Sequence, residues 1–228
     1  MGVFLRDHAV LIVALACIPW SGFFLWKTRD ILGLSGRKLY LAPFIYVITG
    51  LAAMTMFSIL YDIRTFPDFS LRHQGLLAFF PLLFPLFAKL LKKDLRDVSD
   101  ALAVSIPGII AMTRVFCLIN GCCYGRFFPG TSVHIPLREI VMALHLAASF
   151  LLLLWIRRNH PRGILLPAYM LYYGIVRVTE VHFRFNPFWN IGGRDTIMGV
   201  VFITLGILIG IAILDRNDAE KHRKKHAR

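Results

Sequence analysis

The chain alternates long apolar runs with short polar segments, and this pattern dominates its sequence. A helical run of about twenty residues at 1.5 Å per residue spans the roughly 30 Å hydrocarbon core of a bilayer. The pattern therefore predicts about seven membrane-spanning helices, near residues 8–26, 39–61, 73–91, 98–120, 137–156, 163–183 and 194–214. Pro81 and Pro85 lie inside the third run, so we expect a bent or broken helix there. Asp97 or Ser99 is the predicted cap of the fourth helix.

Composition supports an all-α, polytopic membrane protein. Hydrophobic residues make up 57% of the 228-residue chain and charged residues 17%, and the mean hydropathy is +0.64. Soluble domains are nearer 45–50% apolar. We expect one transmembrane domain over residues 1–228, in which residues 215–228 form a basic cytoplasmic tail. The weakly charged N-terminus and an apolar run that continues past Cys17 favour a retained first span over a cleaved signal peptide.

The net charge of +13 is explained by topology, so we expect no nucleic-acid partner. If the C-terminus is cytoplasmic, 17 of the lysines and arginines fall on the inner side and nine on the outer side. The positive-inside rule then places the N-terminus outside. All eight lysines are inner, and the outer cations are Arg6, Arg64, Arg72, Arg114, Arg126, Arg138, Arg177, Arg184 and Arg194. Either this split is chance in an arginine-rich chain, or the outer half binds an anionic headgroup, for which the planar guanidinium is suited.

An arginine lies inside the apolar run that ends in "RVFCLINGCCYGRFF", residues 114–128. Arg114 is about 24 Å along the fourth span, still within the hydrocarbon core. A charged side chain is costly there unless it faces a cavity or a partner. Arg114, Cys117 and Gly121 share a helix face, and Asn120-Gly121 predicts a turn.

The sixth span aligns four polar residues on one helical stripe. Tyr173, Arg177, Glu180 and Arg184 follow the spacing i, i+4, i+7, i+11. Glu180 can pair with either arginine. The stripe is therefore either an ion-pair ladder that holds helices together or part of an anion site, since two arginines face one glutamate.

These motifs resemble those of the prolipoprotein diacylglyceryl transferases. The likeness rests on a His-x-Gly at the start of the third run, "RVFCLINGCCYGR" and "YGIVR", and extends from about Gly50 to Arg184. It implies a seven-span enzyme of the bacterial cytoplasmic (inner) membrane, without a cofactor. Such an enzyme moves the diacylglyceryl group of phosphatidylglycerol to the lipobox cysteine of a prolipoprotein at the outer leaflet.

The resemblance assigns roles to individual residues. The implied catalytic residues are His73, Arg114 and Arg177, in which His73 is the base, ahead of His134 and His182. The implied substrate-binding residues are Asn120, Gly121, Tyr173, Glu180, Arg184 and Arg126. Glu180 lies one residue earlier than the glutamate of the family pattern.

Several positions depart from the family pattern and predict a divergent branch, which uses prolipoprotein or another acceptor. Cys117 replaces the first asparagine of the arginine motif, Cys122 replaces its glutamate, and Gln74 replaces the first glycine after the histidine. The family's His-Pro-x-Gln-Leu-Tyr-Glu is reduced to "HIPLREIV".

The thiols of Cys117, Cys122 and Cys123 lie close together at the predicted outer face. They could brace the loop as a disulfide or supply a thiolate activated by Arg114 and Arg126, and we favour a structural role. A zinc site with His134 lacks the usual ligand spacing, so we predict no metal. Two alternative functions stay open: a membrane thiol oxidoreductase that uses these cysteines, and a non-catalytic lipid-binding homologue.

Overall fold

The computed structural model describes residues 8–61, 74–121, 123–158, 160–184 and 193–226. Within these ranges the chain is mainly helical and has no strand, and two isolated β-bridges join Gly125 to Arg184 and Phe127 to His134. The elements are α2 (Ala9–Lys27), α3 (Arg29–Leu32), α4 (Arg37–Tyr61), α5 (Gln74–Ala78), the 3-10 helix η2 (Phe80–Leu83), α6 (Phe84–Leu91), α7 (Leu95–Ala103), α8 (Ile106–Asn120), α9 (Leu137–Ile156), α10 (Leu165–Phe183) and α11 (Arg194–His226).

Four helical stretches are long and apolar enough to cross a membrane: Arg37–Phe57, Leu95–Asn120, Leu137–Ile156 and Asp195–Glu220. Two further apolar stretches, Leu11–Lys27 and Gly75–Leu91, are shorter. Helix α10 is long enough, but its three tyrosines, Arg177 and Glu180 lower its hydropathy. The all-helical membrane architecture is thus confirmed, while the count of seven spans and their orientation stay predictions.

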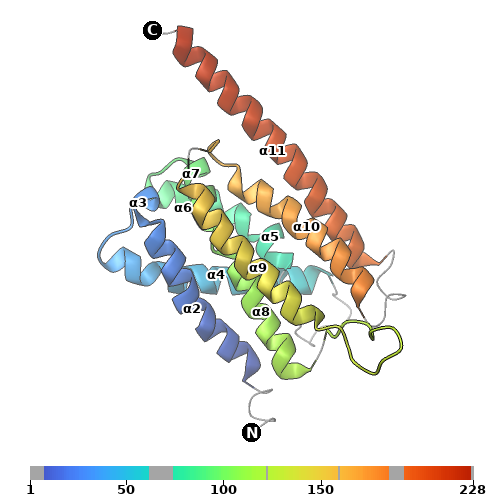
Figure 1. The fold of residues 1–228 in the computed structure, drawn as a ribbon. Helices are drawn as coiled ribbons and strands as arrows, with labels where there is room; N and C mark the ends of the chain where they lie inside the picture. The colour runs from blue at the N-terminus through green and yellow to red at the C-terminus, as the bar shows by residue number, and fades with distance from the viewer. Residues whose placement is uncertain (1–7, 62–73, 122, 159, 185–192, 227–228) are drawn as a thin grey trace.

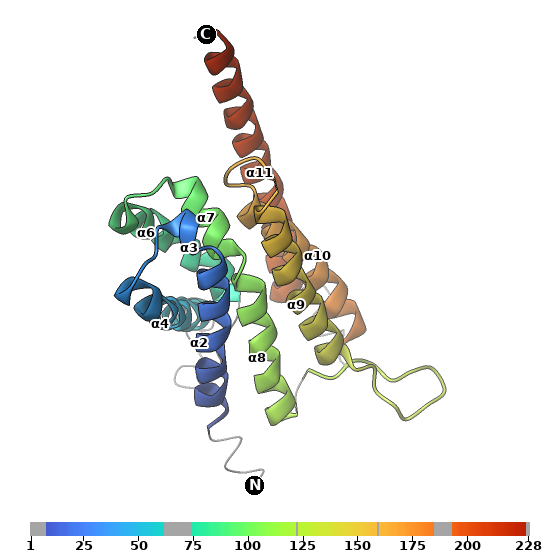
Figure 2. The ribbon, with the colours of Figure 1, turned by 60° about the vertical axis from the view of Figure 1, so that its left-hand side comes forward.

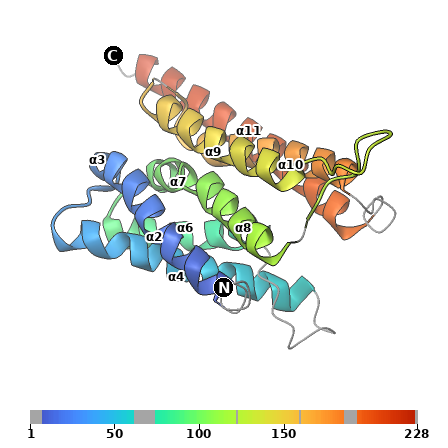
Figure 3. The ribbon, with the colours of Figure 1, turned by 60° about the horizontal axis from the view of Figure 1, so that its bottom comes forward.

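The helices form a bundle in which α8 lies between two groups. Figure 3 shows α9, α10 and α11 side by side, while α2, α4 and α6 lie across α8 from them. Helix α8 packs on α9 and on α2, and α10 packs most extensively on α11. Helix α4 crosses α2 steeply, and α11 projects beyond the rest of the bundle toward the C-terminus (Figures 1 and 2).

Glycines allow α10 and α11 to approach closely. A Cβ atom built on Gly174 would lie 2.5 Å from the carbonyl oxygen of Gly199, and one on Gly206 would lie 2.7 Å from the backbone of Pro167 and Leu171. Small residues at such contacts are typical of helices that associate within a membrane. The close packing fixes the start of α11 against the end of α10, where the candidate site lies.

The third predicted span is broken at its prolines, as expected. Helix α5 ends at Ala78, the 3-10 turn holds Pro81, and Pro85 lies in the first turn of α6. Proline lacks the amide hydrogen needed inside a helix, so each one starts a new segment instead of continuing the last. Gly75 lies against the backbone of α4, where a Cβ atom would meet Met54.

The predicted cap of the fourth span was wrong, while the span itself is present as Leu95–Asn120. Asp94, rather than Asp97 or Ser99, caps α7, because its Oδ1 accepts the backbone amide of Arg96 at 2.8 Å. Hydrogen bonds from the side chain and backbone of Arg96 hold the pKa of Asp94 below its usual value. The span is two helices, α7 and α8, because Pro107 in the first turn of α8 has no amide hydrogen to extend the hydrogen bonds of α7.

A buried carboxylate fixes the start of α10. Asp100 of α7 accepts the backbone amides of Gly163 at 2.6 Å and Leu165 at 2.8 Å, and its Oδ2 lies 3.2 Å from Nε2 of His160. Backbone amides at the N-terminus of a helix have no acceptor within the helix, and Asp100 accepts two amides there. Asp100 therefore ties α7 to the helix that bears the polar stripe.

The predicted tail at residues 215–228 continues α11 as a helix to His226. Glu220 forms an ion pair with Arg96 at 3.0 Å, and Nδ2 of Asn217 donates to the backbone oxygen of Arg162 at 3.2 Å. These contacts join α11 to the loops at the end of the bundle that holds most of the lysines.

Candidate active site

Arg114 lies buried near the end of α8, with 2% of its surface exposed. Its Nη2 donates to Oε2 of Glu180 on α10 at 2.8 Å. The guanidinium thus crosses from α8 to α10, which both pack on α9. A buried arginine in a membrane protein requires such a partner, because an isolated charge there is expensive.

The polar stripe of α10 converges on Glu180, as its spacing predicted. Arg177 donates through Nη1 to Oε2 of Glu180 at 2.9 Å, and Arg184 donates through Nη2 to Oε1 at 2.9 Å. Glu180 is 3% exposed and therefore holds three guanidiniums, those of Arg114, Arg177 and Arg184. Tyr173 is buried one helical turn before Arg177.

Asp195, in the first turn of α11, is a member of the cluster that sequence reasoning missed. Its Oδ2 accepts from Nη2 of Arg177 at 2.7 Å and from Nη1 of Arg184 at 3.2 Å. A carboxylate is also favoured there by the positive end of the helix dipole. The available clue was an acidic residue beside Arg194 at the start of the seventh apolar run, on the side predicted to be outer.

The arginine cluster, defined here as Arg114, Arg177, Glu180, Arg184 and Asp195, has an excess of positive charge. Three guanidiniums against two carboxylates leave one formal positive charge. The buried Nε atoms of all three arginines have no hydrogen-bond acceptor among the described residues. Buried donors are nearly always satisfied, so this arrangement can accept an anion with several acceptor oxygens.

An aromatic wall on α9 and α10 borders the cluster. His145, 1% exposed on α9, has its Nδ1 3.0 Å from the hydroxyl of Tyr169, and its ring stacks on Tyr173 at a centroid distance of 5.8 Å. Sequence reasoning missed His145, although a histidine in the middle of an apolar run was a usable clue. The wall covers the cluster on the α9 side with polarisable rings.

The profile of the prolipoprotein diacylglyceryl transferase family matches residues 31–215, which include the whole arginine cluster. The chain belongs to this family. Two curated relatives bear the name phosphatidylglycerol--prolipoprotein diacylglyceryl transferase. The one numbered 2, from Clostridium perfringens (strain 13 / Type A), is 29% identical over 150 residues, which cover 58% of this chain and 57% of the relative.

The second relative, from Clostridium tetani (strain Massachusetts / E88), is 25% identical over 142 residues, covering 55% of this chain and 57% of the relative. The chain's matches thus span a little over half the length of these relatives. The family resemblance read from the motifs is confirmed.

The family's Asn-Gly pair ends α8 rather than facing the cluster. Gly121 is the C-cap in the left-handed conformation, with φ of 62°, which a side chain would strain. Nδ2 of Asn120 donates to the backbone oxygen of Phe116 at 2.9 Å. The predicted turn is present, and the roles of these two residues in binding substrate stay predictions.

Arg126 lies on the loop between α8 and α9, which pairs with the end of α10. Gly125 forms a β-bridge with Arg184, and Nε of Arg126 donates to the backbone oxygen of Arg184 at 3.3 Å. The Arg126 side chain is exposed and forms no ion pair with the described cluster residues. Its structural effect is to fasten the loop beside Arg184.

Two of the three clustered thiols are adjacent. The Sγ atoms of Cys117 and Cys123 lie 3.7 Å apart and are not bonded, so the disulfide considered above is not formed between these two. Cys122 lies outside the described residues. Among the described residues, no group of three or more histidine, cysteine or acidic side chains could hold a metal ion.

The candidate base His73 lies outside the described residues, so its role stays a prediction. The other two histidines considered do not join the cluster. His134 stacks on Phe127 at 4.0 Å, and His182 is exposed, with its Nδ1 2.8 Å from the backbone oxygen of Val178.

Proposed function

We propose that the chain transfers the diacylglyceryl group of phosphatidylglycerol to the cysteine thiol of a prolipoprotein or a related acceptor. Family membership and the names of the two relatives support this reaction. The observation that favours it most within the chain is the arginine cluster, with one unbalanced positive charge and open donors in a buried site. A phosphodiester supplies the matching single negative charge.

Arg114 has the most hydrogen-bonding capacity left for a phosphate. Only its Nη2 is used, on Glu180, while its Nε and Nη1 contact no acceptor among the described residues. Glu180 holds the guanidinium in one orientation, so its remaining donors are fixed before the lipid binds. Charge-assisted hydrogen bonds from such a group are short and strong.

Arg177 and Arg184 have a different geometry, since each places both Nη atoms on carboxylates. Only their Nε donors are open. Their main contribution is therefore a fixed positive field where negative charge develops on the leaving phosphate. Because the cluster is buried, this field is screened less than it would be in water.

In the proposed reaction the acceptor thiolate attacks the glyceryl carbon of the lipid. A carbon–sulfur bond forms, the carbon–oxygen bond to the phosphate breaks, and glycerol phosphate leaves with the bonding electron pair. His73 is the proposed acceptor of the thiol proton, because imidazole titrates near neutral pH. The arginines compensate the charge of the departing phosphate monoester.

The proposed membrane orientation places the arginine cluster toward the outer face of a bacterial cytoplasmic membrane. The supporting observation is the gathering of Lys27, Lys38, Lys89, Lys92 and Lys93 near the ends of α2, α4 and α6, away from the end of α8 that carries Arg114. Lysine is retained on the cytoplasmic side.

The test is a transfer assay with the purified chain in detergent, phosphatidylglycerol labelled in its glycerol headgroup and a lipobox peptide. We expect release of labelled glycerol phosphate together with a peptide that gains the mass of a diacylglyceryl group. The same peptide with serine in place of cysteine should give neither product. No headgroup release with any phospholipid would contradict the proposal.

Thiol chemistry is the second candidate, because the Cys117 and Cys123 sulfurs lie only 3.7 Å apart. Replacing both with serine separates the two functions. A thiol-oxidation activity that the parent chain shows and the double variant loses would favour the oxidoreductase alternative, whereas no thiol oxidation by the parent chain would remove it.

A further inference from the structure

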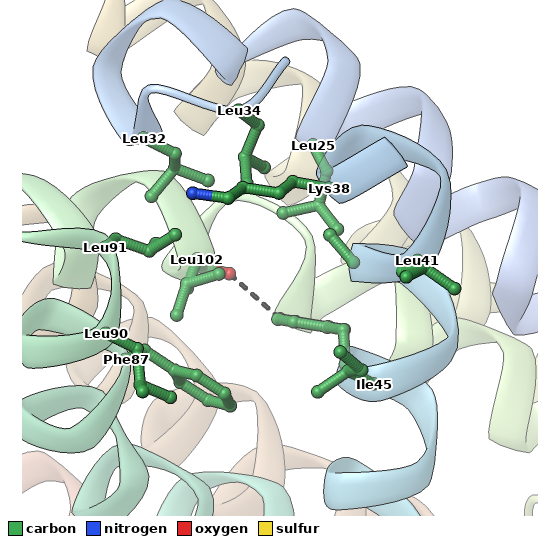
Figure 4. A pocket seen from close by; sticks show the side chains of 12 residues that line it. Leu25, Leu32, Leu34, Lys38, Leu41, Ile45, Phe87, Leu90, Leu91 and Leu102 are labelled. Atoms are coloured by element: carbon green, nitrogen blue, oxygen red, sulfur yellow. Dashed lines mark hydrogen bonds between the residues drawn. The ribbon is translucent and has the colours of Figure 1, made fainter. Parts of the chain in front are cut away.

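An apolar groove of about 270 Å³ lies among α2, α3, α4, α6 and α7, away from the arginine cluster (Figure 4). Its lining includes seven leucines, one isoleucine and a single charged residue, Lys38. The hydroxyl of Tyr46 donates to the backbone oxygen of Leu102 at 3.0 Å, so the polar atom at the α4–α7 contact is satisfied within the protein. The groove thus offers apolar surface and one cation.

The burial of the lining residues shows that the groove has a closed floor and an exposed lip. The floor is buried, as shown by Leu25 at 2% exposure and Leu32 at 1%. The lip is exposed, as shown by Leu41 at 57%, Ile45 at 50% and Leu90 at 67%. In a membrane-spanning chain, an exposed lip of branched aliphatic side chains faces lipid tails rather than water.

Aromatic and basic side chains mark the headgroup level beside this groove. Trp26, which is 45% exposed, has Nζ of Lys27 4.5 Å from its ring centroid and the guanidinium carbon of Arg29 5.6 Å away. Tryptophan and cations gather where a helix meets the lipid headgroups. Leu25, next to Trp26 in sequence, lines the groove, so the groove begins directly below the headgroup level.

The ammonium of Lys38 lies over the groove, between Leu32 and Leu34 in Figure 4. Lys38 is exposed and makes no ion pair with the described residues. Its charge is therefore available to a ligand whose apolar part enters the groove. Further cations at this end, Lys27, Arg29, Arg37, Lys89, Lys92 and Lys93, reinforce the attraction to negative charge.

We propose that this groove binds one acyl chain of an anionic phospholipid from the leaflet at the lysine-rich end, whose phosphate lies against Lys38. The site is distinct from the arginine cluster, and it needs neither the transfer reaction nor His73. A phospholipid is the occupant favoured here because one molecule combines an aliphatic chain, a phosphate at headgroup depth and access from the hydrocarbon region.

The experiment counts bound lipids on the delipidated full chain by native mass spectrometry. The chain is titrated with phosphatidylglycerol and, separately, with phosphatidylethanolamine that has identical acyl chains. Lys38→Glu should weaken one phosphatidylglycerol-binding event about fivefold or more and should weaken phosphatidylethanolamine binding less, because the ammonium of that lipid offsets its phosphate charge. Ala42→Trp, which fills the groove, should remove one bound lipid of either kind.

Lys89→Glu is the matched control, because it makes the same charge change at the same end outside the groove lining. An equal effect of Lys89→Glu and Lys38→Glu would mean general attraction to the basic surface and would overturn the proposal. Undiminished lipid binding by Ala42→Trp, with an unchanged elution volume, would overturn it as well. If Ala42→Trp does not fold, the comparison of Lys38→Glu with Lys89→Glu decides alone.

The variant Arg177→Lys distinguishes a failure of the groove proposal from a failure of the proposed transferase function. That variant should retain the groove lipid while it loses transfer activity. Loss of transfer in Arg177→Lys without lipid loss in the groove variants refutes the groove alone. Lipid loss in the groove variants without any transfer activity in the parent chain refutes the transferase alone.

Discussion

The two ends of this bundle use positive charge in opposite ways. At the arginine cluster, two guanidiniums are buried and that of Arg184 is partly buried, and each contacts at least one carboxylate. At the other end, Lys38, Lys89, Lys92 and Lys93 are exposed. The arginine cluster depends on geometry, because a planar guanidinium can contact two carboxylates at once. The lysines at the other end contribute their charge alone. Each of the following predictions tests this contrast.

The largest expected effect follows a change of arginine to lysine in the cluster. Arg177→Lys keeps the charge but cannot contact Glu180 and Asp195 together, so transfer activity should fall about a hundredfold or more. The initial rate of glycerol phosphate release measures it. Arg158→Lys, the same change at an exposed position of the other end, should keep the parent rate. A normal transfer rate in Arg177→Lys would contradict the view that the cluster needs the geometry of a guanidinium and not only its charge.

Removing a carboxylate should unfold the cluster end more readily than the opposite end. Glu180→Gln leaves the buried Arg114 without its carboxylate, and Arg177 and Arg184 with only Asp195, so the free energy of unfolding should drop by about 3–5 kcal/mol. Thermal unfolding in detergent measures the drop. Glu220→Gln, which breaks the ion pairs with Arg96 and Arg216 at the exposed Glu220 carboxylate, should leave the midpoint of thermal unfolding almost unchanged. Equal losses of stability in Glu180→Gln and Glu220→Gln would show that burial does not make the carboxylate of the cluster more important for stability than the exposed one.

A smaller loss is expected at the buried carboxylate of the lysine-rich end. Asp100→Asn places an amide donor against the amides of Gly163 and Leu165, which should cost about 1–3 kcal/mol. The midpoint of thermal unfolding measures the loss. Asp97→Asn is the control on the same helix, since Asp97 only pairs at 3.5 Å with the exposed Arg162. A stable Asp100→Asn would show that α10 does not depend on this cap.

The smallest effect is expected for the thiols. A double replacement of Cys117 and Cys123 by serine keeps the side-chain size and removes only the sulfur contact at 3.7 Å. Transfer activity should stay within about twofold of the parent, because the arginine cluster is untouched. A large loss of activity would place the thiols in the reaction.

Local patterns in the sequence were sufficient for some parts of this site. The break of the third span follows from Pro81 and Pro85, which act within their own turn, and the stripe from Tyr173 to Arg184 follows from helical periodicity. The convergence of Arg114 with that stripe was expected only through the family resemblance, because it depends on how α8 and α10 pack around α9.

Other features could not be predicted from local sequence, because they depend on tertiary contacts or because several residues were equally suitable. Asp195 joins the cluster only because α11 packs closely on α10, and no local pattern reports that contact. Asp94, Asp97 and Ser99 are all suitable helix caps, and the hydrogen bond to the Arg96 amide selects Asp94. His73 stays a prediction from the family pattern.

The uninterrupted length of helix α11 determines how far its C-terminal end lies from the membrane. Its 33 residues, at about 1.5 Å each, give a rod of roughly 50 Å, while the hydrocarbon layer takes up roughly 30 Å of it. In the proposed orientation the bilayer with its headgroups takes up about 40–45 Å, so the last turns reach about one Debye length beyond the lipid surface at physiological salt. A flexible tail of the same composition could lie flat on acidic lipids, whereas a helix that continues to His226 carries its end away from the rest of the bundle (Figure 2).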